Sequence, residues 1–262
     1  MTALGERLAR AIDATGPMPV ARWMALGNAH YYATRDPLGA SGDFTTAPEI
    51  SQMFGELIGA WMTDMWRRAG SPEQVRLVEL GPGRGTLMAD MLRSMAAAKW
   101  TPAVDFVETS PVLREAQRER VPDATWHDSL DSVPDDAPIL LVANEFFDAL
   151  PVRQFVRGDA GWSERMIGAG FVPTIGAADA TPLVAPVLWN APLGSVVETS
   201  PASTAIAAEI GGRLSRHGGA ALLIDYGHSG PVTGDTLQAV RGHAAAHPFA
   251  DPGEVDLTAH VE

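Results

Sequence analysis

The sequence of 262 residues contains no cysteine, and only one of its 19 basic residues, Lys99, is a lysine. Without cysteine the chain cannot form a disulfide, a thiolate nucleophile, a cysteine-ligated zinc site or an iron–sulfur cluster. A phosphate-binding P-loop is also excluded, because that loop needs Gly-Lys followed by Ser or Thr, and Lys99 is followed by Trp100. A Schiff-base enzyme would have to use Lys99. These absences exclude mechanisms without proposing one.

Long apolar runs and an excess of positive charge are lacking as well. No uninterrupted apolar stretch reaches the ~18 residues that a membrane span needs. The first residues carry Glu6 and Asp13 and no apolar core, which is unlike a transit peptide or a secretory signal, so we expect a cytoplasmic protein. The net charge of −13 disfavours nucleic acid as a partner. It favours either simple solubility or a cationic substrate or basic partner surface.

The first 70 residues are predicted to be mainly helical. Helices are expected at Leu4–Ala14 and again from Val20, with a loop from Tyr31 to Thr45. Apolar residues then recur at helical spacing from Ile50 to Trp66, which predicts an amphipathic helix.

Two features of this third helix are specific. Thr46 and Glu49 fit a capping box at its start, in which each side chain accepts a hydrogen bond from a first-turn backbone N–H. Gly55 and Gly59 lie one turn apart inside it, where each glycine costs about 1 kcal/mol relative to alanine. We therefore expect a neighbouring backbone or a ligand to approach closely at these two glycines.

From Val75 onward, strands alternate with helices, which predicts an α/β fold with a doubly wound parallel sheet. The rhythm is interrupted at about residues 151–197, where short β-like stretches indicate an antiparallel insertion. The expected strands of the parallel sheet are Val75–Leu80, Ala103–Glu108, Ala124–Asp128, Pro138–Glu145 and Ala220–Asp225. Thr236–Arg241 is a further candidate strand.

A glycine-rich turn gives the strongest local signal for chemistry. Gly81, Gly83 and Gly85 follow a buried strand and precede an amphipathic helix, so the backbone can turn tightly and approach a ligand. Glu108 ends the next strand, where a carboxylate can accept hydrogen bonds from both hydroxyls of a ribose.

The spacing of these glycines distinguishes two kinds of cofactor. Dinucleotide sites show Gly-x-Gly-x-x-Gly, whereas here position 86 is Thr and the third glycine comes one residue early. Glu79 followed by the three glycines is similar instead to the first motif of class I S-adenosylmethionine-dependent methyltransferases. In such folds Asp128, at the end of the third strand, would lie near the adenine; an exposed loop position is the alternative.

Acidic and amide side chains also follow the fourth strand. Asn144, Glu145 and Asp148 lie at the sheet edge where open α/β folds bind ligands. Because buried carboxylates need partners, this group favours a functional role over a helix-capping one.

Five blocks of sequence extend the resemblance beyond a single turn, and together they are similar to the MidA-like methyltransferase family. Members of this family include a mitochondrial complex I assembly factor that methylates arginine. The blocks span residues 42–52, 78–86, 144–151, 223–228 and 253–260.

The resemblance implies S-adenosyl-L-methionine as cofactor and a protein substrate, with arginine of a respiratory complex I subunit as the candidate acceptor. It implies a helical segment with a cofactor-covering loop at 1–70 and a Rossmann-like core at 71–262. Relatives continue beyond the last block, so we expect a C-terminally truncated form of the domain. The implied cofactor-binding residues are Gly42, Asp43, Thr46, Glu49, Glu79, Gly81, Gly83, Gly85, Glu108, Asp128 and Asn144.

An arginine acceptor would need carboxylates to orient the guanidinium and to offset its charge. Glu145, Asp148 and Asp225 are the acidic candidates, and Tyr226 and His228 are candidates to complete the pocket or to act as a base.

Three alternatives remain open at this stage. The chain could be a nucleotide-dependent oxidoreductase, which the early third glycine disfavours, or a non-catalytic assembly protein that retains the cofactor fold. His243 and His247 have the i,i+4 spacing of metal ligands, but nearby prolines argue against one helix presenting them, so we expect no metal. The sequence indicates nothing about oligomeric state.

Overall fold

The computed structural model describes residues 2–39, 42–43 and 45–262. The chain divides into two compact units. The first, called here the antiparallel unit, comprises Met1–Tyr31, Phe147–Thr204 and Asp225–Glu262. The second, the parallel unit, comprises Tyr32–Phe146 and Ala205–Ile224.

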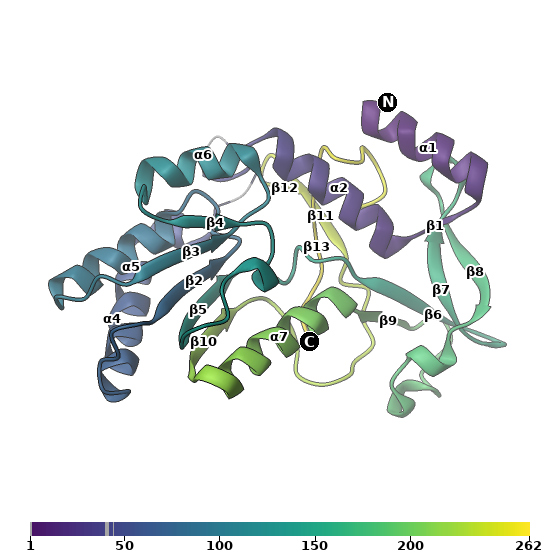
Figure 1. Ribbon diagram of the computed structural model, residues 1–262. Helices are drawn as coiled ribbons and strands as arrows, with labels where there is room; N and C mark the ends of the chain where they lie inside the picture. The colour runs from purple at the N-terminus through teal and green to yellow at the C-terminus, as the bar shows by residue number, and fades with distance from the viewer. Residues whose placement is uncertain (1, 40–41, 44) are drawn as a thin grey trace. The chain divides into compact units, whose positions relative to one another are not determined.

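The parallel unit is built on a five-stranded, all-parallel sheet (Figure 1), as the alternation of strands and helices predicts. The strand order reverses between β5 and β2, and doubly wound sheets bind ligands at the carboxyl ends of the strands at such a point. In spatial order the strands are β10 (Gly219–Ile224), β5 (Ile139–Asn144), β2 (Arg76–Leu80), β3 (Ala103–Val107) and β4 (Thr125–His127).

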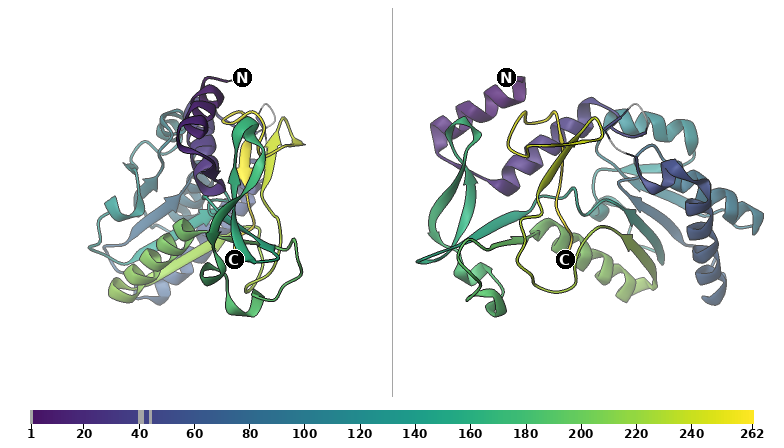
Figure 2. Two further views of the ribbon diagram at one scale, coloured as in Figure 1. Left: turned by 90° about the vertical axis from the view of Figure 1, so that its right-hand side faces the viewer. Right: turned by 180° about the vertical axis from the view of Figure 1, so that it is seen from behind.

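Helices cover both faces of this sheet (Figures 1 and 2). α4 (Gln52–Arg68) and α5 (Thr86–Ala97) lie on one face and α7 (Pro201–His217) on the other. α6 (Pro111–Arg120) begins at Ser110, whose hydroxyl accepts a hydrogen bond from the Leu113 N–H at 3.2 Å. A 3-10 turn, η1 (Leu130–Ser132), follows β4.

The two glycines of α4 allow it to pack closely on α5, as the sequence predicts. A Cβ on Gly55 would lie 2.6 Å from the Asp90 Cβ, and one on Gly59 would lie 2.6 Å from the Met91 carbonyl oxygen. The neighbour is therefore helix backbone. Apolar residues of α4, α5, β2 and β3 form one core beneath this contact, including Met62, Met88, Leu77 and Phe106.

The antiparallel unit contains α1 (Ala3–Thr15) and most of α2 (Val20–Thr34), together with two sheets. The larger sheet confirms the predicted antiparallel insertion: it runs β1-β7-β6-β9, with β8 paired to β7. These strands are β1 (Met18–Pro19), β6 (Arg153–Gly158), β7 (Gly161–Ile167), β8 (Pro173–Asp179) and β9 (Val196–Thr199). Short 3-10 turns lie between them: η2 (Ala169–Phe171), η3 (Thr181–Leu183) and η4 (Pro186–Leu188).

The smaller sheet of this unit is β12-β11-β13, with bounds Gln238–Arg241 for β11, Ala244–Ala246 for β12 and Asp256–Thr258 for β13. The candidate strand at Thr236–Arg241 thus forms β11, in an antiparallel sheet of its own.

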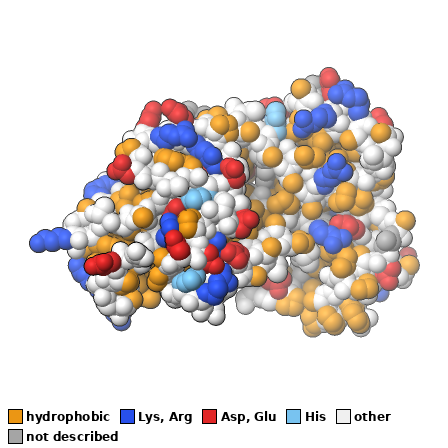
Figure 3. Space-filling model, in the orientation of Figure 1, with side chains coloured by type: hydrophobic (Ala, Val, Ile, Leu, Met, Phe, Trp, Pro, Cys, Tyr) orange, Lys and Arg blue, Asp and Glu red, His pale blue; other side chains and the backbone are white. Residues whose placement is uncertain are grey.

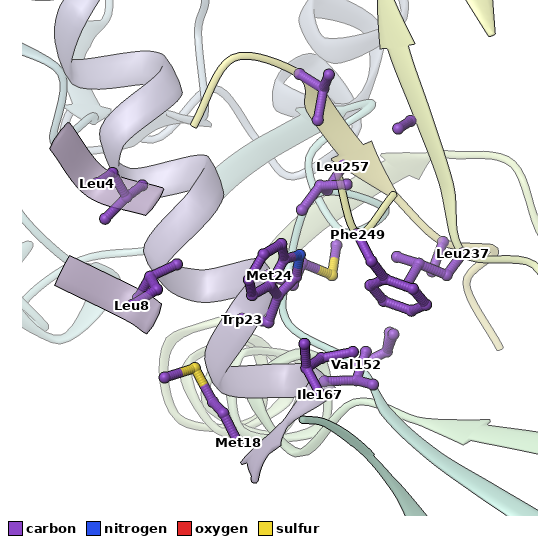
Figure 4. Packing of buried hydrophobic residues seen from close by; sticks show 14 of the residues in the cluster. Leu4, Leu8, Met18, Trp23, Met24, Val152, Ile167, Leu237, Phe249 and Leu257 are labelled. Atoms are coloured by element: carbon purple, nitrogen blue, oxygen red, sulfur yellow. The ribbon is translucent and has the colours of Figure 1, made fainter. Parts of the chain in front are cut away.

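A continuous apolar core joins α1 and α2 to this smaller sheet (Figure 4). Trp23 lies at its centre: its indole N–H donates to the Pro248 carbonyl at 2.9 Å, and its ring contacts Phe171 and Phe249 edge-on. Asn28 of α2 is also buried. Its amide donates to the carbonyl oxygens of Ala149 and Leu257 and accepts from the Leu257 N–H, so one side chain ties α2, the turn after Phe147 and β13 together.

Two local predictions are wrong. α2 continues as helix to Thr34, although Tyr31–Thr34 was expected to be loop; Tyr31 is fully buried, and this packing favours continued helix. The capping box at Thr46 is absent, because the Thr46 side chain makes no capping bond. Instead the chain forms a short α3 (Ala47–Ile50) and breaks at Ser51, whose hydroxyl accepts from the Met53 N–H and caps α4. Within the part of the chain that the structure describes, no helix is long and apolar enough to cross a membrane.

Candidate functional site

The glycine turn joins β2 to α5 in the parallel unit. Gly81, Gly83 and Gly85 have φ values of 60°, 55° and 80°, a region that favours glycine. A Cβ on Gly81 would lie 2.7 Å from the Phe146 ring, and one on Gly83 would lie 2.8 Å from a Leu38 methyl group. The turn therefore needs glycine both for its conformation and for the space around it.

Glu79 lies on β2 just before this turn and is 2% exposed. Its Oε2 atom is buried without a hydrogen-bond partner. Burial, with a smaller contribution from the negative charge of Glu108, raises the pKa of the Glu79 carboxyl from 4.5 to about 8. The site thus holds an orphaned polar atom of the kind that a ligand satisfies.

Glu108 follows β3 and is almost fully buried. Its Oε1 accepts from the Ser110 N–H at 2.7 Å, and its Oε2 accepts from the Gln117 amide at 3.3 Å. Burial raises the pKa of the Glu108 carboxyl, while these hydrogen bonds and the charge of Arg114 oppose the rise.

Arg84, inside the glycine turn, holds the preceding loop against it. Its guanidinium donates to Asp36 at 2.6 Å, to the Leu38 carbonyl at 2.6 Å and to Glu49 at 3.4 Å. Glu49 also accepts from the Thr86 hydroxyl at 2.5 Å, so it anchors the loop rather than capping a helix. Arg84 was not among the predicted site residues, although its place between two of the glycines was a signal.

The rest of the predicted loop is compact where it is described. The N–H groups of Gly42 and Asp43 donate to the carbonyl oxygens of Gly39 and Pro37, and a Cβ on Gly42 would lie 2.0 Å from the Pro37 oxygen. Thr46 precedes α3 and is half-buried. Residues 40 and 41, just before the first block of the family resemblance, and residue 44, inside it, lie outside the described residues.

Three further predicted residues lie at strand ends of the parallel unit. Asp128 is exposed after β4 and accepts from Arg114 at 2.7 Å. Asn144 ends β5, and Glu145 follows it with φ of 50°, an uncommon conformation for a residue other than glycine. The Glu145 N–H donates to the Ile224 carbonyl at 2.8 Å, which holds this conformation next to β10.

The remaining predicted residues belong to the antiparallel unit. The Asp225 carboxylate accepts from the backbone N–H groups of Phe147 at 2.9 Å, Asp148 at 3.2 Å and Tyr226 at 2.9 Å. The structure thus brings the Asp225 side chain to the backbone N–H of Asp148. Tyr226 is 64% exposed, and the His228 Nδ1 lies 3.0 Å from the Gly230 carbonyl oxygen.

The two histidines considered as metal ligands lie in and after the smaller sheet of the antiparallel unit. His243 occupies the β11–β12 turn with φ of 59°, and the His247 ring accepts a hydrogen bond from the Phe249 N–H. Among the residues that the structure describes, no three His, Asp or Glu side chains gather as a metal site.

Positive charge is dispersed rather than gathered. On the face shown in Figure 3, arginine side chains alternate with acidic ones. Among the described residues, arginine side chains form ion pairs, including Arg76 with Asp136, Arg153 with Glu164 and Arg216 with Asp135. Such a surface offers no basic stripe for a phosphate backbone on this face.

Comparison with known proteins identifies the family. Residues 57–262 match the sequence profile of a family of S-adenosyl-L-methionine-dependent methyltransferases. The chain belongs to this family.

Its relatives include "Protein arginine methyltransferase NDUFAF7 homolog, mitochondrial" from Drosophila melanogaster, which is 38% identical over 99% of this chain and 68% of its own length. The mouse protein arginine methyltransferase NDUFAF7, mitochondrial, is 37% identical over 100% of this chain and 68% of its own length. A solved structure from Burkholderia thailandensis, bound to S-adenosyl-homocysteine, is 28% identical with a TM-score of 0.79 and covers 99% of this chain and 73% of that chain.

These findings confirm the methyltransferase activity and the S-adenosyl-L-methionine cofactor, and they decide against the oxidoreductase alternative. They also overturn one expectation. The prediction of a cytoplasmic protein is wrong, because the curated relatives are named as mitochondrial proteins. The composition of the first residues therefore did not indicate location in this family.

Proposed function

We propose that this methyltransferase acts on arginine side chains of a protein, with a subunit of respiratory complex I as its substrate. The observation that carries the proposal is the 36–38% identity, over 98–100% of this chain, to relatives named protein arginine methyltransferases. The net charge of −13 suits a cationic acceptor.

The proposed cofactor site lies in the parallel unit, at the carboxyl ends of β2 and β3. S-adenosyl-L-methionine supplies an activated methyl group on a positively charged sulfur. Gly81, Gly83 and Gly85 leave room for its close approach, Glu79 offers a buried carboxyl oxygen, Oε2, that has no hydrogen-bond partner, and Glu108 offers acceptors for a ribose. The residues therefore fit the group.

The remaining predicted cofactor residues are assigned to three places around this site. We assign Gly42, Asp43, Thr46 and Glu49 to the cover of the site, because Arg84 and Thr86 hold Glu49 to the glycine turn. Asn144 is proposed to contact the cofactor from the end of β5. The exposed Asp128, beside Arg114, is proposed to lie near the adenine.

Glu145 is the proposed residue that orients the acceptor. A guanidinium stays charged at neutral pH, so transfer requires a carboxylate that binds it, directs one nitrogen at the methyl carbon and receives the proton lost when the N–C bond forms. The left-handed backbone at Glu145 is the kind of outlier that clusters at functional sites.

Asp148, Tyr226 and His228, which belong to the antiparallel unit, are proposed as catalytic residues because they lie in two of the sequence blocks shared with the family. Asp225 is better suited to positioning. Three backbone N–H groups occupy its carboxylate, so we propose that it holds the Phe147–Asp148 turn.

The proposal is tested by incubating the purified protein with S-adenosyl-L-methionine carrying a labelled methyl group and with isolated complex I subunits. Methylarginine in the acid hydrolysate of the substrate is the expected result. Glu145→Gln should abolish transfer while S-adenosyl-homocysteine still binds. Glu119→Gln, which removes one exposed carboxylate from α6, is the matched control and should leave transfer unchanged.

Label found in lysine would contradict an arginine acceptor. Cofactor binding with no transfer to protein would instead support the assembly-protein alternative, and full transfer by the Glu145→Gln variant would remove Glu145 from the acceptor site.

A further inference from the structure

One buried side chain of α6 connects three elements of the proposed cofactor site. Gln117 is 0% exposed. Its amide nitrogen donates to the Gly83 carbonyl at 2.7 Å and to the Glu108 Oε2 at 3.3 Å, and its amide oxygen accepts from the Trp126 indole N–H at 2.8 Å. These contacts link the glycine turn, the end of β3 and β4.

The stem of Gln117 lies beside the same turn. A Cβ added to Gly85 would lie at an ordinary van der Waals distance, 3.5 Å, from both the Cα and the Cγ of Gln117. The amide head of Gln117 is therefore the part that holds the turn, through the Gly83 carbonyl.

The chemistry of the contacts requires an amide. The group must donate twice and accept once, and only the side-chain amides of Asn and Gln do so in one plane. An ionised Glu at this position could not donate and would face the Glu108 carboxylate. An apolar residue would leave the Gly83 carbonyl, one Glu108 oxygen and the Trp126 N–H without these partners, and buried polar groups without partners are costly.

We propose that Gln117 is a positioning residue of the cofactor site, which fixes the Gly83 carbonyl and the Glu108 carboxylate relative to each other. It acts through these groups and does not touch the reacting atoms. The inference rests on the proposed assignment of the glycine turn and Glu108 to the cofactor. Its consequence is that loss of Gln117 weakens cofactor binding more than it slows transfer from bound cofactor.

The test measures the Kd of S-adenosyl-homocysteine by calorimetry for the wild-type chain and for Gln117→Met, Glu108→Gln and the double variant. Methionine keeps the length of the side chain and removes its hydrogen bonds. We expect Gln117→Met to raise the Kd at least ~10-fold, equivalent to ~1.4 kcal/mol, with kcat at saturating cofactor changed less than ~2-fold.

The double variant tests whether Gln117 acts through Glu108. Residues in one hydrogen-bond network give non-additive effects. The double variant should therefore bind more tightly than the product of the two single effects predicts, whereas effects that multiply would overturn this connection.

Gln154→Met is the matched control. Gln154 is also 0% exposed and bonded to Glu198, Asp235 and Arg165, but it belongs to the antiparallel unit. We expect this variant to lower the melting temperature, because a similar number of hydrogen bonds is lost in both variants. The Kd should stay within ~2-fold of wild type, because Gln154 does not contact the proposed cofactor residues.

The possible failures are distinguishable. If Gln117→Met lowers the melting temperature and leaves the Kd unchanged, Gln117 contributes to stability alone, and the positioning role is overturned. If Gln117→Met does not fold, Gln117→Leu, which also removes the hydrogen bonds and adds no charge beside Glu108, must show the same split between Kd and kcat. If Glu108→Gln itself binds normally, the proposed cofactor assignment fails; if only Gln117→Met binds normally, the positioning inference alone fails.

Discussion

The buried carboxyl of Glu79 predicts a dependence of stability on pH that one substitution removes. The unfolded chain releases this proton near pH 4.5, whereas the folded chain holds it to about pH 8 because burial disfavours the charge. Between these values the folded state binds more protons than the unfolded state, so the contribution of Glu79 to stability falls as pH rises. It is fully present below pH 4.5 and is lost by about pH 8.

Glu79→Gln replaces the titrating group with a neutral one of the same shape. At 1.36 kcal/mol per pKa unit, the shift predicts that the variant gains roughly 4 kcal/mol relative to wild type at pH 8, and less than about 1 kcal/mol at pH 5. Any pH-independent effect of the amide adds equally at both values. The informative quantity is therefore the difference between the two pH values, about 3 kcal/mol.

Urea denaturation of both proteins at pH 5 and pH 8, without cofactor, measures this difference. Glu119→Gln, which removes an exposed carboxylate, should show no comparable dependence on pH. If the Glu79→Gln variant gains the same stability at pH 8 as at pH 5, the Glu79 carboxyl is ionised in the folded protein, and the reasoning from burial is refuted.

Three further outcomes follow from contacts in the structure. Gly59→Ala should lower the free energy of unfolding by about 1–3 kcal/mol, because its Cβ would overlap the Met91 backbone, whereas Gly211→Ala, with no atom within 4 Å of the added Cβ, should be neutral or stabilising in thermal unfolding. Arg84→Met should raise the Kd of S-adenosyl-homocysteine about 10-fold by releasing the loop from the glycine turn, and an unchanged Kd in calorimetry would contradict the clamp. Asp225→Ala should lower the unfolding free energy by about 2 kcal/mol in urea titration, because three backbone N–H groups lose their acceptor; a wild-type value would mean that water replaces the carboxylate.

Sequence reasoning succeeded where one residue type has one physical use. Gly55 and Gly59 disfavour a helix, so their presence inside one predicted that another part of the chain or a ligand packs closely against them. α5 is that neighbour. The alternating glycines after β2 likewise predicted a tight turn, and all three adopt left-handed conformations.

It failed where a polar side chain had several possible partners. The Thr46–Glu49 spacing matches a capping box, but Glu49 bonds instead to Thr86 and Arg84, which approach from the glycine turn. The sequence around Glu49 does not reveal these competing partners, because Arg84 and Thr86 lie more than 30 residues away along the chain.

Gln117 was missed although a signal existed. It lies four residues after Leu113, on the face of α6 that is otherwise apolar and buried, and a polar residue at such a position needs partners. Which partners they are depends on the packing of β4 and the glycine turn against α6, and that packing is not a property of the helix sequence.

The Asn28 amide has a consequence for the order in which this protein folds. Its hydrogen bonds join α2 to Ala149 and to Leu257, which are 121 and 229 residues away along the chain. Closing such long loops is entropically unfavourable and slow relative to local contacts. Because α1 and α2 precede β13 along the chain, their shared core is complete only after β13 has been synthesised. Until then the apolar faces of α1 and α2 stay uncovered, and they are the expected contact points for a chaperone.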